Sequence, residues 1–197
     1  ILLSEIPTGK LTEEHFTQDE IKLTSPGEGE VLVRTLILSQ DAANRAWMQG
    51  ATYRSALSSG QVMSSGGIGE VVESNNERFS VGQIVSGDLG WQEYAVLLGH
   101  QLALLKDHDG PLSHSLSLLG VAGLTAYHGL INVPDIHAGE VLLVSAAGGS
   151  VGSIVGQIGR IKGAKVIGIA GGTEKCRWVV DELGFDACLD YKDTSAP

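Results

Sequence analysis

The sequence predicts an α/β protein in which a small antiparallel β-barrel precedes the first half of a doubly wound parallel sheet. Up to about residue 110, short β-rich runs alternate with turn residues, which is typical of small antiparallel barrels. From Leu112 onward, strands alternate with helical segments, and such connections place parallel strands in one sheet. We therefore expect one domain over residues 1–111 and a second over residues 112–197.

The individual elements follow from hydrophobic runs that are bounded by glycine, proline and polar turn residues. In the first domain we expect strands at residues 31–38, 68–73, 83–87, 92–97 and 102–105. In the second we expect helices at 113–119 and 124–131, then a strand at 141–145, a helix at 151–162, a strand at 165–170, a helix at 173–183 and a strand from 188 to 191. This order is β-α-β-α-β.

Charge and composition exclude several classes of protein. Thirteen basic and twenty-three acidic residues give a net charge of −10, which disfavours nucleic acids and anionic membranes as partners. No apolar run approaches the ~18 residues of a membrane-spanning helix, and the N-terminus lacks the features of a targeting segment. We therefore expect a cytoplasmic protein. Cys176 and Cys188 cannot supply a disulfide framework, so we expect free reduced thiols.

A glycine-rich turn carries the strongest functional signal. The segment Ala147-x-Gly149-x-x-Gly152 follows a buried strand and opens a helix, which is the context of a dinucleotide-binding fingerprint. Gly149 would let the backbone approach a pyrophosphate, Gly152 would let the helix pack on the strand, and the helix N-terminus would face the phosphates. The alternative interpretation is an ordinary tight turn.

The end of the second parallel strand indicates which dinucleotide is bound. NAD sites place a carboxylate there for the ribose hydroxyl, but this strand ends at Gly171-Gly172-Thr173 without an acid. Lys175 and Arg177 follow immediately, and two cations suit a 2′-phosphate. The cofactor is therefore predicted to be NADP(H), unless these side chains are simply the solvated first turn of a helix.

Several linked motifs resemble the medium-chain dehydrogenase/reductase superfamily. They are Gly-Leu-Thr-Ala-Tyr at 123–127, the turn at 146–152, Gly-Gly-Thr-Glu-Lys at 171–175 and Leu-Gly-Phe-Asp at 183–186. Within the superfamily the chain looks most like the prostaglandin reductase, alkenal double-bond reductase and curcumin-reductase-like group. The resemblance implies a GroES-like catalytic barrel domain, a Rossmann NADP-binding domain and a homodimer.

The resemblance also assigns roles to individual positions. Thr125 would lie near the nicotinamide, Lys175 would bind the 2′-phosphate and Tyr191 would lie on the adenine side. The pyrophosphate would be held by Gly149, Ser150, Val151 and Gly152. NADPH would donate a hydride to the carbon-carbon double bond of an α,β-unsaturated ketone or aldehyde.

A metal site is not expected. Residues 1–110 contain no cysteine, and the six histidines show no ligand spacing, so the zinc chemistry of alcohol dehydrogenases lacks its ligands. Donors near the substrate carbonyl would instead stabilise the developing enolate. Tyr53, in a polar loop, is the candidate acid or orienting donor; the alternative is a packing or rim residue.

Two departures from the family pattern leave the function open. The family's Asp-Pro-Tyr-Met-Arg stretch reads Asp-Ala-Ala-Asn-Arg at residues 41–45, which would make the pocket floor wider and more polar. The chain also stops where a third parallel strand begins, whereas such sheets commonly have six, so we expect part of a longer protein. A quinone oxidoreductase of the same superfamily and a non-catalytic NADPH-binding relative remain alternatives.

Overall fold

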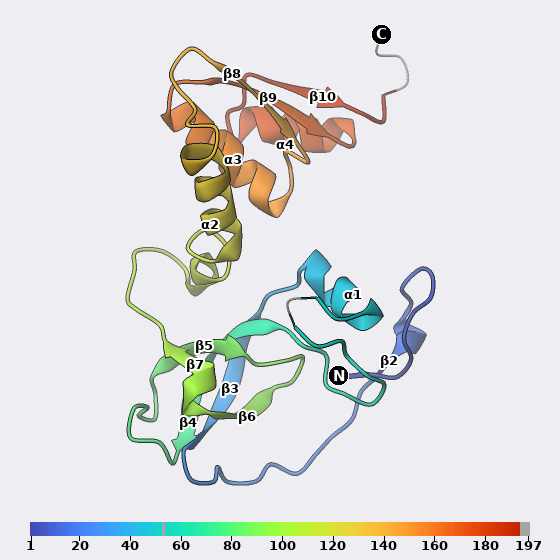
Figure 1. Cartoon of the computed structure of the whole chain (residues 1–197), viewed down its shortest axis with the longest axis vertical. Helices are drawn as coiled ribbons and strands as arrows, with labels where there is room; N and C mark the ends of the chain where they lie inside the picture. The colour runs from blue at the N-terminus through green and yellow to red at the C-terminus, as the bar shows by residue number, and fades with distance from the viewer. Residues whose placement is uncertain (53, 194–197) are drawn as a thin grey trace. The chain divides into compact units, whose positions relative to one another are not determined.

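A computed structural model describes residues 1–52 and 54–193, and the chain forms two compact units, residues 1–112 and 113–197 (Figure 1). The first contains a curled antiparallel sheet and the second a parallel sheet with helices. The predicted fold class is confirmed by these two architectures. No helix in the described parts of the chain combines the length and apolar character needed to cross a bilayer.

The first unit is organised around five antiparallel strands in the order β6-β3-β4-β5-β7. Their bounds are β3 Glu30–Leu38, β4 Gly66–Ser74, β5 Ile84–Asp88, β6 Tyr94–Leu98 and β7 Leu102–Leu104. Two further short strands, β1 Leu2–Leu3 and β2 Phe16–Thr17, pair with each other. Three consecutive residues at the start of β3, Val31 to Val33, are buried, and Arg34 is exposed.

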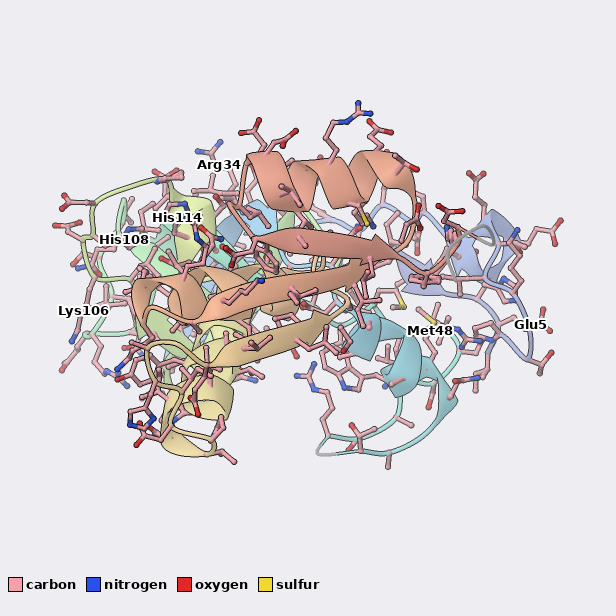
Figure 2. The ribbon with its side chains drawn as sticks, turned by 90° about the horizontal axis from the view of Figure 1, so that it is seen from above. Glu5, Arg34, Met48, Lys106, His108 and His114 are labelled. Atoms are coloured by element: carbon pink, nitrogen blue, oxygen red, sulfur yellow. The ribbon has the colours of Figure 1, made fainter. Side chains whose placement is uncertain are left out.

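Helix α1 (Ala42–Gln49) lies in this unit and was not among the expected elements. The Asp41 amide at its start donates to Asn44 Oδ1 at 2.6 Å. Asn44, Trp47 and Met48 are buried at the i, i+3, i+4 spacing of one helix face. In Figure 2, Met48 lies inward on this helix, whereas Glu5 extends to the periphery.

The second unit is built on a parallel sheet in the order β10-β9-β8. Its strands are β8 Val141–Ser145, β9 Lys165–Ala170 and β10 Ala187–Asp190, and its helices are α2 Val121–Tyr127, α3 Ser150–Ile161 and α4 Thr173–Asp181. Both α3 and α4 cover the same face of the sheet (Figure 1). Gly156 allows the close approach of α3, because a Cβ there would lie 1.8 Å from Phe185 Cζ.

The region before β8 differs from expectation. A helix was predicted over residues 113–119, but the structure has a 3-10 turn over Leu112–Ser115. The serines explain the difference, since Ser117 Oγ donates to the Ser113 carbonyl at 2.9 Å and such bonds compete with regular helix formation. The next helix, α2, starts earlier than predicted and continues as a π-helical turn over His128–Asn132.

Candidate nucleotide-binding site

The glycine turn connects the end of β8 to the start of α3. Ala146 adopts a left-handed conformation with φ 50°, and its carbonyl accepts a 2.8 Å hydrogen bond from the Gly149 amide. The Ala147 amide donates to the Ile169 carbonyl at 3.0 Å and so connects the turn to β9. Helix α3 begins at Ser150, and both Ser150 and Val151 are exposed.

The packing of the turn itself requires glycine at 152 and leaves little room for a side chain at 149. A Cβ on Gly152 would lie 2.4 Å from the Ala146 carbonyl oxygen, and a Cβ on Gly149 would lie 3.0 Å from the same atom. The first amides of an α-helix have no partner within the helix. The tight glycine turn therefore places the N-terminus of α3 at the carboxyl end of β8. The free amides of that N-terminus can bind a phosphate.

Lys175 reaches the glycine turn from the other βα unit. Its side-chain stem lies across Gly148, where an added Cβ would meet Lys175 Cγ at 2.7 Å and Cδ at 2.8 Å. Lys175 and Arg177 are both exposed on α4. The missing side chain at Gly148 therefore makes room for a cation beside the N-terminal end of α3.

A second turn, Gly171-Gly172, links β9 to α4 beside Tyr191. A Cβ on Gly171 would lie 2.6 Å from the Tyr191 hydroxyl oxygen, so the phenol ring lies against this turn. Tyr191 is 68% exposed, which leaves much of its ring available to a ligand. The structure thus brings Tyr191 to the end of β9.

The carboxylate of Asp190 binds this turn, and the sequence motifs did not indicate this residue. It accepts hydrogen bonds from the Gly172 amide at 2.7 Å and the Lys192 amide at 3.0 Å. These two backbone bonds lower the pKa of Asp190. The acid that the fingerprint requires is expected at the tip of the second parallel strand, whereas Asp190 ends the neighbouring third strand. Adjacent carboxyl ends of parallel strands are the signal that could have found it.

Thr125 occupies a different setting from the turn residues. It lies on the exposed side of α2, and its hydroxyl donates to the Val121 carbonyl at 2.7 Å. The hydroxyl oxygen keeps lone pairs for a further hydrogen bond. Helix α2 packs against α3, which places Thr125 in the same unit as the glycine turn.

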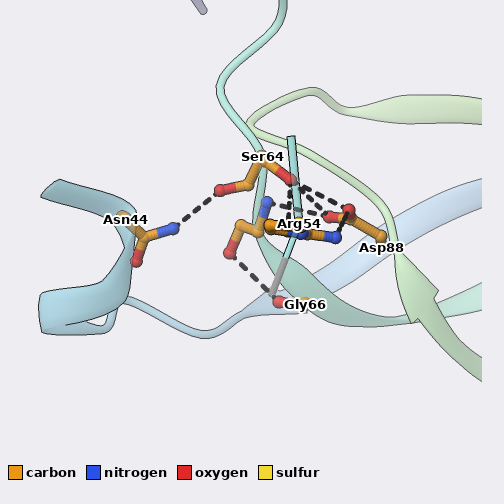
Figure 3. A network of polar contacts seen from close by, with 6 residues as sticks. Asn44, Arg54, Ser64, Gly66 and Asp88 are labelled. Atoms are coloured by element: carbon orange, nitrogen blue, oxygen red, sulfur yellow. Dashed lines mark hydrogen bonds and ion pairs between the residues drawn. The ribbon is translucent and has the colours of Figure 1, made fainter. Parts of the chain in front are cut away.

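In the first unit, Arg54 is the centre of a polar network (Figure 3). Its guanidinium donates to Ser64 Oγ at 2.6 Å, forms an ion pair with Asp88, and lies 4.3 Å from the centroid of the Trp47 ring. Asp88 also accepts from Ser64 Oγ at 2.9 Å. The Asn44 amide nitrogen donates to the Ser64 carbonyl at 2.6 Å. The network therefore connects α1, the segment around residue 54, the segment before β4 and the end of β5.

The predicted donor Tyr53 lies outside the described residues, but its neighbours are described. The Thr52 amide donates to the Arg54 carbonyl at 2.9 Å, and Arg54 is held by the network of Figure 3. In the nearby stretch at residues 41–45, Arg45, which the family pattern keeps, donates to the Pro7 and Gly9 carbonyls at 3.2 and 3.0 Å. Asn44, which departs from that pattern, binds the Ser64 carbonyl in the network described above. Among the described residues, no group of three or more His, Cys, Asp or Glu side chains could hold a metal ion.

Comparison with known proteins connects both units to one family. Residues 1–105 match the family model described as the N-terminal domain of oxidoreductase. NADPH-dependent curcumin reductase from Escherichia coli is 44% identical over 191 residues, covering 96% of this chain and 55% of the relative. An NADP(+)-dependent 2-alkenal reductase from Nicotiana tabacum is 35% identical, covering 98% of this chain and 58% of the relative.

A solved structure extends the likeness to the fold of the whole chain. The crystal structure of CurA in complex with NADPH from Vibrio vulnificus superposes with a TM-score of 0.90 at 39% identity, covering 98% of this chain and 58% of that chain. This chain thus spans a little more than half the length of these relatives. With its first half matched by the family model, the chain belongs to the medium-chain dehydrogenase/reductase superfamily, as its sequence motifs had indicated.

Proposed function

We propose that this chain belongs to an NADPH-dependent reductase that acts on the carbon-carbon double bond of α,β-unsaturated ketones or aldehydes. The observation that carries the proposal is the Lys175 stem lying across Gly148, which brings a cation to a glycine turn already shaped for a dinucleotide. Relatives named as NADPH-dependent curcumin reductase and 2-alkenal reductase support both the cofactor and the reaction.

The nucleotide would be held mainly by the second unit. The amides of Ser150, Val151 and Gly152 would donate to the pyrophosphate, since a helix N-terminus attracts anions. Gly149, whose own amide binds the Ala146 carbonyl, would let the backbone approach the pyrophosphate. Lys175 would bind the 2′-phosphate, as a lysine point charge commonly does, and the exposed Arg177 would add a second positive charge. Tyr191 would lie on the adenine side and Thr125 near the nicotinamide.

The geometry of the described residues fits this cofactor. Gly152 and Gly149 allow α3 to begin within reach of the Ala146 carbonyl, so the helix amides lie at the surface of the turn. Asp190 already binds the Gly172 amide, which removes that donor from competition for the phosphates. NADPH, when bound, supplies the hydride.

We propose that Tyr53 donates a hydrogen bond to the substrate carbonyl oxygen or orients it. A well-placed donor of this kind stabilises a developing oxyanion by roughly 2.7–4 kcal/mol. The Arg54 network supports the proposal, because it fixes the residue that follows Tyr53 with two side-chain hydrogen bonds and a contact with the Trp47 ring.

Cofactor binding and turnover test the proposal separately. The purified protein is titrated with NADPH and with NADH, and then mixed with NADPH and a panel of enones and alkenals while cofactor oxidation is followed. We expect preference for NADPH and turnover of at least one enone. Binding without any turnover would favour the non-catalytic alternative, and equal affinity for the two cofactors would contradict the role of Lys175.

A quinone oxidoreductase is the nearest alternative enzyme. One solved quinone oxidoreductase, from Pseudomonas syringae, superposes with a TM-score of 0.66 at 28% identity, compared with 0.90 and 39% for the NADPH complex described above. Product analysis with a quinone and an enone offered together separates the two activities. We further propose a cytoplasmic homodimer, which sedimentation of the purified protein and fractionation of its source cells would test.

A further inference from the structure

Two cysteines from different elements meet in the second unit. Cys176 is on α4 and is buried, and Cys188 is on β10 and half-buried. They are 12 positions apart in sequence, and their sulfurs are 2.8 Å apart, with the Cys188 thiol donating to Cys176 Sγ. Both are free thiols. No local sequence pattern predicts this contact, because one cysteine is in a helix and the other is in the strand that follows it.

The surroundings hold the two thiols together. Cys176 Sγ lies 4.0 Å from the Ala170 carbonyl at the end of β9, and Cys188 packs against the buried core of the unit. Burial and the neighbouring thiol raise the pKa of Cys188 to about 12. Cys188 therefore keeps its proton at neutral pH, and this protonated thiol is a slow nucleophile.

We propose that Cys176 and Cys188 form a reversible oxidation site that closes to a disulfide in the presence of a hydroperoxide. One thiol sulfur attacks an oxygen of hydrogen peroxide, the O–O bond breaks and one water leaves. This sulfur thereby becomes a sulfenic acid. The second thiol then attacks the sulfur of the sulfenic acid, whose hydroxyl leaves as a second water, and the S–S bond forms. In total, two thiols lose two protons and two electrons, and one hydrogen peroxide becomes two waters. The inference does not depend on the proposed function.

The position of this oxidation site defines its physical consequence. The bond would join the first half of α4 directly to β10, and it would close a loop between residues 176 and 188. These elements also carry Lys175, on one side of Cys176, and Asp190, two residues beyond Cys188. A disulfide stabilises chiefly by restricting the unfolded chain. We therefore expect oxidation to stabilise the unit that bears the glycine turn.

Intact-mass analysis after peroxide treatment tests the site. The chain has two cysteines in all, so titratable thiols should fall from two to none, and the mass should fall by two hydrogens. A reductant such as dithiothreitol should restore both thiols. The melting temperature of the oxidised protein should rise by on the order of 5 °C.

Two variants make the result specific. Cys188→Ser and Cys188→Ala each leave Cys176 in place, and neither should show the loss of two hydrogens or the rise in melting temperature. The proposal is overturned if wild type keeps two titratable thiols after treatment. It is equally overturned if the mass increases by oxygen atoms, or if the thiols disappear through covalent dimers on a non-reducing gel.

Discussion

The glycine turn of the second unit and the Arg54 network of the first are built in opposite ways. The turn depends on backbone atoms and on side chains that are absent, because Cβ atoms at Gly149 and Gly152 would meet the Ala146 carbonyl. The network depends on side chains that are present, which come from four segments separated by up to 44 positions. The glycine turn is encoded in seven consecutive residues, 146–152, and could be found by reading the sequence, whereas the Arg54 network could not.

This difference predicts how each region responds to substitution, and Gly152→Ala should have the largest effect. The new Cβ would lie 2.4 Å from a backbone oxygen that cannot rotate away, so the start of α3 must shift. We expect a loss of roughly 3 kcal/mol or more in unfolding free energy, together with loss of NADPH binding. Chemical denaturation and a cofactor titration measure the two effects.

The matched control for that substitution is Gly129→Ala. Gly129 is in the same unit, and a Cβ there would have nothing within 4 Å. It should leave both the stability and the NADPH affinity close to wild type. If Gly152→Ala behaved like this control, the glycine turn would not be limited by backbone packing.

Lys175→Ala sharpens the comparison, because it removes the side chain that lies across the glycine turn and leaves the backbone of the turn unchanged. The 2′-phosphate would lose its cation, so NADPH affinity should fall on the order of tenfold, given the exposure of Lys175. NADH affinity should stay nearly constant, and titrations with both cofactors provide the measurement. Lys162→Ala, an exposed lysine at the end of α3, is the control; equal loss for NADPH and NADH would contradict a 2′-phosphate role.

Arg54→Lys tests the region built by side chains. Lysine keeps the positive charge but lacks the planar guanidinium group. That group binds Ser64 and Asp88 at the same time and stacks on the Trp47 ring. Because the ion pair is 32% and 42% exposed, we expect a stability loss of only about 1 kcal/mol. If the network positions the segment carrying Tyr53, kcat should fall while the KM for NADPH stays unchanged.

Asp88→Asn is the partner experiment. Asparagine at 88 keeps an acceptor for Ser64 and Ser65 but leaves Arg54 without its counterion. The double variant should cost less than the sum of the two single variants, because the residues share one network. Additive losses in stability would show that Arg54 and Asp88 act independently.

Asp190→Asn should have the smallest effect, and it depends on pH. The pKa of Asp190 is lowered in the folded protein, so its stabilising contribution is present above the unfolded value of about 3.9 and is lost as the pH falls through the folded pKa. The variant should therefore melt slightly lower than wild type at pH 7 and at the same temperature at very acidic pH. If the difference in melting temperature between the variant and wild type did not change with pH, the loss would come from the altered side-chain shape and not from the lost charge.

The parallel-sheet elements were predicted well, and the physical reason is local. Strands at Val141–Ser145 and Lys165–Ala170 have the predicted bounds, because each is a short apolar run that ends at glycine or small residues. Helix α1 was missed because it spans only eight residues and buries only one face. The helix predicted over residues 113–119 was wrong, because the chain forms a 3-10 turn over Leu112–Ser115 and the Ser117 side chain binds the Ser113 carbonyl there.

The candidate site divides in the same way. Gly149, Gly152 and Lys175 were identified from spacing alone, and their geometry is compatible with the roles proposed for them. Asp190 and the Arg54–Asp88 pair were not identified, since each depends on segments that only folding brings together. The role of Tyr53 stays a prediction, because Tyr53 lies outside the described residues.

The sequence by itself determined the order of the two architectures, the position of the glycine turn and the cations that follow the second parallel strand. These features depend on residues that are adjacent or one helical turn apart, so local sterics and periodicity suffice to specify them. Only the tertiary structure decided that the Lys175 stem crosses Gly148, that Asp190 binds the Gly172 amide, and that Cys176 meets Cys188 at 2.8 Å. The first two contacts arise because parallel strands bring distant carboxyl ends to one edge of the sheet, and the third arises because α4 packs on β10. No local pattern encodes either proximity.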